Sequence, residues 1–195
     1  MRAFYLSALL FLAALSCATA QQIHAPTAQT SGPDFRRQVE KQTFLLVNQY
    51  RKENDFPPLA WDDAIANTAR AHSKDMASGD SDFGHDGFSE RIAHLKETKP
   101  GIGGAGENVL YSSDLNDIAT RAVQMWLHSP HHLKNIRGDY NYSGLGVWQD
   151  KDGTMYFTQI FLKIKPPAQE TQAASPSSDA AFMGLLGNPY PRSSH

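Results

Sequence analysis

The sequence predicts an α+β domain in which helices come first and strands come last. Apolar residues recur every three or four positions through much of residues 34–126, as in helices with one buried face. Two apolar runs, residues 145–148 and 155–161, flank a short polar turn and predict a β-hairpin. With 195 residues and 41% apolar composition, the chain is long enough for one domain with a substantial core.

Two longer helices are expected at the start of this domain. Asp34 is a candidate cap for a helix that runs to about Asn54, and the Pro57-Pro58 pair then ends it. A second helix begins at Trp61-Asp62 and ends at Gly79, a residue type that favours helix C-termini.

Shorter elements follow. A brief helix is expected over residues 89–95, and Asp114 or Asn116 caps another that runs to Trp126, before Pro130. The glycine-rich residues 101–106 match a dinucleotide-binding pattern without its strand–helix context, so we interpret them as a loop with tight backbone turns before Glu107. Residues 150–153 form the turn of the predicted hairpin.

The ends of the chain differ from its middle. Residues 1–20 resemble a secretory signal peptide, with a basic start, an apolar stretch and a small-residue cleavage site. Residues 21–37 are expected to be a flexible leader, residues 38–163 the domain, and residues 164–195 a low-complexity tail interrupted by the apolar cluster 182–186. We therefore expect a secreted, extracellular protein with no transmembrane segment in its mature chain.

Charge and cysteine content narrow the functional classes. The formal net charge is −2, which does not favour binding to nucleic acid or to an anionic membrane surface. The single cysteine, Cys17, falls inside the expected signal peptide, so the mature chain would have no disulfide and would depend on its core for stability.

Three short motifs carry the strongest functional information: Phe83-Gly84-His85, Gly106-Glu107-Asn108-Val109, and Trp126-Leu127-His128-Ser129-Pro130-His131-His132-Leu133-Lys134-Asn135-Ile136. In this order and spacing they resemble the CAP superfamily, also called the SCP domain family. Its members include cysteine-rich secretory proteins, venom antigen 5 and plant pathogenesis-related class 1 proteins. The absence of cysteine from the expected mature chain is similar to the bacterial and fungal branch. The resemblance covers about residues 38–163 and implies a three-layer α-β-α sandwich around a central antiparallel sheet.

The resemblance also implies a cleft lined by histidine and glutamate side chains. His85 and His132 match the two histidines, and Glu107 matches the first glutamate. Ser129 stands at or near the position of the second glutamate, so this chain would offer only one negative charge to a divalent cation. Asn108 and Asn135 are expected to support the cleft by bracing the backbone around it.

Taken without the resemblance, these residues leave several chemistries open. Two imidazoles and one carboxylate are a plausible set for zinc or another divalent ion, and equally for a general acid and base acting through a water. They also suit a polar surface groove with no chemistry. Separately, Asn141-Tyr142-Ser143 is a glycosylation sequon, relevant if the chain passes through a eukaryotic secretory pathway.

The favoured hypothesis is a non-catalytic binding protein for a lipid or sterol, with no required cofactor, as the resemblance implies. The buried apolar area of the ligand would provide the affinity. One alternative is a hydrolase in which His85 and His132 hold a metal or polarise a water while Glu107 acts as base. Another is a structural or interaction role at a cell wall or matrix, with the polar ends as tethers and a cell-surface or cell-wall component as the partner. We expect a monomer.

Overall fold

The computed structural model describes residues 31–165; the predictions for residues 1–30 and 166–195, including the signal peptide and most of the tail, lie outside this range. The elements follow in the order α1 (Pro33–Glu53), β1 (Ala60–Trp61), α2 (Asp63–Ser78), α3 (Phe88–Thr98), β2 (Ile102–Ser112), α4 (Ile118–Leu127), α5 (Pro130–Ile136), β3 (Tyr142–Gln149) and β4 (Met155–Ile164). Among the helices in residues 31–165, none is long and apolar enough to span a bilayer.

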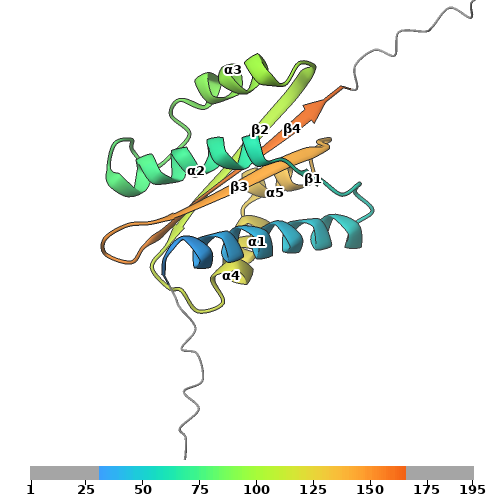
Figure 1. Cartoon of the computed structure of the whole chain (residues 1–195). Coiled ribbons are helices and arrows are strands. Elements are labelled where there is room, and N and C mark those ends of the chain that lie inside the picture. The colour runs from blue at the N-terminus through green and yellow to red at the C-terminus, as the bar shows by residue number, and fades with distance from the viewer. Residues whose placement is uncertain (1–30, 166–195) are drawn as a thin grey trace, which may run out of the picture. The chain divides into compact units, whose positions relative to one another are not determined.

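The strands form one four-stranded sheet in the order β1-β3-β4-β2. β4 pairs antiparallel with both β2 and β3, and the two-residue β1 pairs parallel with β3. Helices α2 and α3 cover one face of the sheet, while α1, α4 and α5 cover the other (Figure 1). This arrangement confirms the predicted α-β-α sandwich and its mainly antiparallel central sheet.

Each face of the sheet has its own apolar core, because successive side chains of a strand point to opposite faces. On β4, Phe157 and Phe161 join the larger core, which includes Trp126 of α4. Ile160 and Leu162 of the same strand join the smaller core with residues of α2 and α3. All five side chains are fully buried, so the sheet is covered on both sides.

Two glycines of β3 bring the backbone of α2 directly against the sheet. A Cβ atom added at Gly144 would overlap the backbone nitrogen of Ala66, and one added at Gly146 would overlap that of Arg70. The buried Ser73 hydroxyl of α2 donates to the Gly146 carbonyl at 3.0 Å, so the contact is also bonded. No side chain other than hydrogen fits at either strand position.

The predicted ends of the second helix are confirmed. The Asp62 carboxylate accepts a hydrogen bond from the Ile65 backbone N–H at 3.0 Å and so caps the N-terminus of α2. Gly79 follows the last turn with φ of 78°, the left-handed conformation that ends helices at little cost for glycine.

The predicted start of the first helix was wrong. α1 begins at Pro33, so residues 33–37 of the expected leader are helical, and Gly32 rather than Asp34 occupies the cap position. Proline suits the first turn because its missing N–H has no helical partner there. Asp34 lies inside the first turn instead, where its negative charge favours the helix dipole.

Two further local predictions were wrong. Helix α4 is preceded by Asp117, with φ of 45°, and not capped by Asp114 or Asn116; the Asp114 carboxylate instead accepts from the Asn116 backbone N–H at 3.0 Å. The glycine-rich segment is not a loop, because residues 102–106 form the first half of β2 and pair with the end of β4. Pairing with a distant strand outweighs the local preference of glycine for turns.

The close contact between β3 and α2 predicts that an added methyl group lowers the stability far more at Gly146 than at Gly103. Gly146→Ala should lower the free energy of unfolding by about 3 kcal/mol or more, because α2 must move off β3. Gly103→Ala is the matched control, since a Cβ there meets its nearest neighbour, a Lys165 side-chain carbon, at an ordinary 3.5 Å. It should change stability by less than about 0.5 kcal/mol. Urea unfolding measures both, and equal losses would contradict this account.

Candidate functional site

The Glu107 carboxylate of β2 is the centre of the candidate site. Its side chain is only 2% exposed, and a buried carboxylate needs a cation and hydrogen-bond donors. Arg91 of α3 supplies both: Nη2 donates to Oε1 and to Oε2 at 2.8 Å, and Nε donates to Oε2 at 3.1 Å. The third Arg91 nitrogen, Nη1, donates to the Asp86 carbonyl at 2.7 Å, which attaches the preceding loop to the same guanidinium.

His85 lies on that loop and completes the environment of Glu107. Its Nδ1 is 2.9 Å from Glu107 Oε1, while 54% of the imidazole side chain is exposed. Because an ionised carboxylate only accepts hydrogen bonds, Nδ1 carries the proton in this arrangement. Nε2 is then the ring nitrogen available to a ligand or a water.

A second histidine, His72, bonds to the same loop from helix α2. His72 of α2 is 3% exposed, and its Nε2 donates to the Gly84 carbonyl at 2.9 Å. Burial is the main cause that lowers the pKa of His72, and it outweighs the hydrogen bond to Gly84, which raises the pKa. A neutral imidazole with its proton on Nε2 therefore connects α2 to the residue directly before His85.

His132 reaches the site from α5. Burial lowers its pKa, and the neighbouring His85 and His131 reinforce this. Its backbone carbonyl accepts a hydrogen bond from Asn108 Nδ2 at 3.2 Å. Asn135 Nδ2 in turn donates to Asn108 Oδ1 and to the Glu107 carbonyl, both at 2.9 Å. The structure thus places both asparagines between α5 and β2.

The remaining residues that the motifs singled out lie outside this network. Ser129 occupies the position before α5, and its side chain makes no capping hydrogen bond there. His131 is exposed, and His128 Nδ1 lies 2.7 Å from the Gln124 carbonyl of its own helix. Asn141 uses its side chain structurally: Nδ2 donates to the Ile164 carbonyl and Oδ1 accepts from the Ile164 N–H, both at 2.8 Å.

The three predicted metal ligands do not fit a metal ion in this arrangement. Within residues 31–165, no three histidine, cysteine, aspartate or glutamate side chains are grouped so as to hold an ion. Glu107 directs its two oxygens to Arg91 and His85, so the positive charge beside it comes from the guanidinium. A divalent cation at Glu107 would have to displace that ion pair.

An apolar groove opens beside the two histidines. It has a volume of about 540 Å³ and is lined by Phe83, Gly84, His85, Val109, Leu110, Tyr111, Met125 and His132. Three of its large side chains are about half exposed: Phe83 at 47%, Tyr111 at 53% and Met125 at 45%. The Phe83 ring meets Tyr111 edge-on at 4.9 Å, and Tyr111 stacks on Tyr156 at 5.9 Å. The groove therefore has an aromatic wall, and two imidazoles belong to its lining.

Sequence reasoning missed several of these residues. Arg91 and His72 belong to the site only through contacts between elements that are distant in sequence. A glutamate expected inside the fold needs a cation beside it, and this requirement could have pointed to an arginine such as Arg91. The aromatic side chains of Trp126 and Phe157 are fully buried in the core and line no groove. Phe83 and Tyr111 form the groove instead.

The fold and motifs are those of one protein family. The family model described as the cysteine-rich secretory protein family, CAP, matches residues 44–161, so the chain belongs to the CAP family.

Relatives extend this assignment. The chain is 34% identical over 130 residues to the uncharacterized membrane protein YlbC of Bacillus subtilis and 28% identical over 135 residues to YkwD of the same organism. These matches cover 64% and 68% of this chain, but only 34% and 50% of the relatives, so the chain spans at most about half of their length.

Solved structures agree. An extracellular SCP-domain protein from Bacillus anthracis matches with a TM-score of 0.57 and 31% identity over 68% of this chain and 45% of its own. An outer surface protein of Borrelia burgdorferi shares the fold, with a TM-score of 0.57 and 20% identity over 66% of this chain and 95% of its own.

Removal of the guanidinium should destabilise the fold through Glu107. Arg91→Met leaves the buried carboxylate without its cation, and we expect a loss of about 3 kcal/mol in the free energy of unfolding at neutral pH. Adding Glu107→Gln should recover part of this loss, because the unpaired charge is then gone. Urea unfolding of the two single variants and the double variant measures the coupling; strictly additive losses would refute it.

The two histidines whose pKa is lowered, His72 and His132, should make the fold sensitive to acid. Folding lowers the pKa of His72 and His132, so the unfolded chain binds more protons than the native one. Their contribution is complete above about pH 6.5 and is lost as the pH falls from there through the folded-state pKa. His72→Gln should flatten this part of the stability–pH curve, whereas the exposed His94→Gln should not. An unchanged slope in His72→Gln would contradict the role given to this residue.

Proposed function

We propose that this CAP protein is an extracellular, non-catalytic binding protein that holds an amphipathic lipid, such as a fatty acid or a sterol, in the groove beside His85 and His132. The observation that carries the proposal is the half-exposure of Phe83, Tyr111 and Met125 around one hollow. Folding has left three large side chains in water at a single place, where a ligand can cover them. The volume of about 540 Å³ lies within the range of small-molecule sites.

The apolar and the polar residues of the lining suit the two parts of such a ligand. An acyl chain or a sterol ring system would cover the aromatic wall, gaining about 25 cal/mol for each Å² of apolar surface removed from water, before ordering costs. A carboxylate or hydroxyl headgroup would pair with His85 Nε2 and His132, which belong to the lining together with the Tyr111 hydroxyl. Arg91 and Glu107 neutralise each other, so the headgroup meets no unpaired negative charge from Glu107.

Secretion is part of this proposal. The Bacillus anthracis relative is described as extracellular and the Borrelia burgdorferi relative as an outer surface protein, whereas YlbC is named a membrane protein. Residues 1–20 have the pattern of a signal peptide. Together these observations support export of this chain. Because no cysteine follows residue 20, the exported chain would fold without forming a disulfide.

Substitutions in the groove should weaken lipid binding without unfolding the domain. Tyr111→Ser and Met125→Glu alter exposed side chains, so we expect folding to be retained and the Kd for a fluorescent long-chain fatty acid or sterol to rise at least about tenfold. Leu45→Glu is the control, because Leu45 is also a large exposed apolar residue but lies on α1. Fluorescence titration gives the three values. Equal affinity in all variants would reject the groove as the binding site.

One observation favours a hydrolase as the second candidate. The Glu107–His85 pair orients an exposed imidazole in the way a general base is oriented, with Nε2 available to a water. In this version Glu107 positions His85 and holds no metal. Turnover of a fatty acyl p-nitrophenyl ester that disappears in His85→Gln would support it. If the wild-type protein binds the ester without hydrolysing it, the hydrolase hypothesis is rejected and the binding function is retained.

A further inference from the structure

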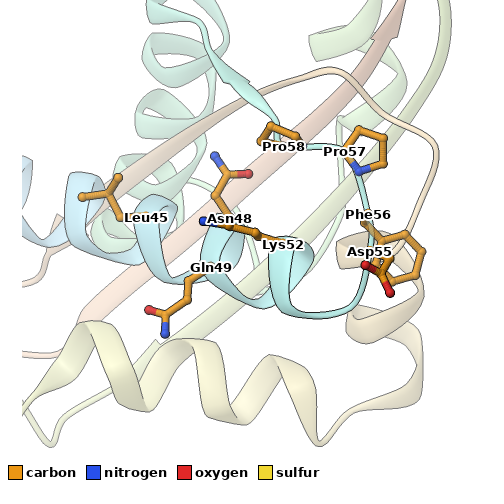
Figure 2. Close-up of a pocket in the computed structure, with 8 residues that line it drawn as sticks. All are labelled: Leu45, Asn48, Gln49, Lys52, Asp55, Phe56, Pro57 and Pro58. Carbon is orange, nitrogen blue, oxygen red and sulfur yellow. The ribbon is translucent and has the colours of Figure 1, made fainter.

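A second apolar groove lies away from the candidate site, on the outer side of α1. It has a volume of about 770 Å³ and is formed by α1 and by the corner that joins α1 to β1. Figure 2 shows its eight lining residues: Leu45, Asn48, Gln49 and Lys52 from the helix, and Asp55, Phe56, Pro57 and Pro58 from the corner. Leu45 is 65% exposed, the highest exposed fraction among the large apolar residues in the described part of the chain.

The groove continues along α1 through Leu45. A smaller hollow of about 260 Å³ adjoins it and is lined by Lys41, Phe44, Leu45 and Trp61. Leu45 therefore lies between two apolar depressions, with Lys41 beside one and Lys52 beside the other. We call these two hollows together the α1 groove.

Hydrogen bonds hold the corner of the α1 groove in one shape. Asn48 Nδ2 donates to the Leu59 carbonyl at 2.9 Å, and the Leu59 N–H donates to Asn48 Oδ1 at 2.8 Å. The buried Arg51 donates from Nε to the Pro57 carbonyl at 2.8 Å, and the Phe56 N–H donates to the Arg51 carbonyl at 2.9 Å. A groove that is already ordered loses little conformational entropy when an extended segment enters it.

The last described strand ends close to this corner. Ala60 of β1 pairs with Tyr142, and Tyr142 pairs with Leu162 of β4, so Leu162 is two strand spacings, about 10 Å, from Ala60. Asn141 connects both sides: its carbonyl accepts from the Ala60 N–H at 2.9 Å, and its side chain pairs with Ile164. β4 runs toward the end of the sheet where the corner lies (Figure 1).

The sequence beyond Lys165 contains one apolar cluster, Phe182-Met183-Gly184-Leu185-Leu186. Sixteen residues, 166–181, separate Lys165 from this cluster. Such a linker spans up to about 50 Å when extended, and about 20 Å as a random coil, which exceeds the distance to the corner. Glu170 and Asp179 are the acidic residues of the linker, opposite in charge to Lys41 and Lys52.

We propose that the α1 groove is the docking site of the chain's own C-terminal apolar cluster, residues 182–186, with Leu45 at the centre of the contact. The covalent link keeps the cluster at a high effective concentration near the groove, so a modest interface suffices. Docking would cover Leu45 and leave the candidate site, which lies on other elements, accessible. The proposal is independent of lipid binding.

A spin label in the cluster tests this directly. Full-length protein carrying Cys17→Ser and Gly184→Cys, with the label on residue 184, should show selective loss of amide NMR intensity around residues 41–48, at Phe56 and around residues 59–61. Leu45→Glu in the same chain should restore those intensities, because a charge then stands in the apolar contact. Met125→Glu is the matched control on another surface and should leave the loss unchanged. The diamagnetic form of each protein supplies the reference spectrum, which also reports whether each variant is folded.

Three results would overturn the proposal. Intensity loss spread evenly over the surface would mean that the cluster does not dock, and loss centred on another patch would mean that it docks elsewhere. Loss at the α1 groove that also appears on isotope-labelled protein mixed with separately spin-labelled, unlabelled protein would mean that a second copy occupies the groove.

Discussion

The close approach of α2 to β3 is the constraint on which the rest of the structure depends. Gly144 and Gly146 let the helix backbone rest directly on the sheet, and this depth places His72 where it can hold the Gly84 carbonyl. Gly84 precedes His85, so the orientation of the exposed imidazole follows from two glycines on a distant strand. A CAP site of this kind is therefore only as well ordered as the packing of the layer beneath it.

Charge pairing then decides what the site can do. Glu107 is buried on β2, an edge strand of the sheet, and a buried carboxylate without partners would destabilise the fold. Arg91 and His85 provide partners for its two oxygens. The pair makes the carboxylate a structural element that joins β2, α3 and the His85 loop. It also removes the negative charge that a divalent cation would need. What remains accessible is an apolar groove whose lining includes two imidazoles, the surface on which the lipid-binding proposal rests.

Patterns local in sequence were predictable, and contacts between distant elements were not. The caps of α2 at Asp62 and Gly79 and the hairpin around residues 150–153 follow from nearest-neighbour chemistry, and the motifs brought His85, Glu107 and His132 to attention. The strand at residues 102–106 exists because β4 pairs with it, which no local preference of glycine indicates. Arg91 and the half-exposed Phe83 and Tyr111 likewise acquire their roles only from the packing of α3, β2 and the loop between residues 79 and 87.

The groove beside His85 and His132 is the central claim, and native mass spectrometry of the protein as secreted tests it most directly. The account predicts a stoichiometric fatty acid or sterol on the wild-type protein that is absent from the folded Met125→Glu variant and present on Leu45→Glu. A wild-type protein without bound lipid that also takes up none from added fatty acid or sterol would contradict the account, and so would a lipid that Met125→Glu retains in full.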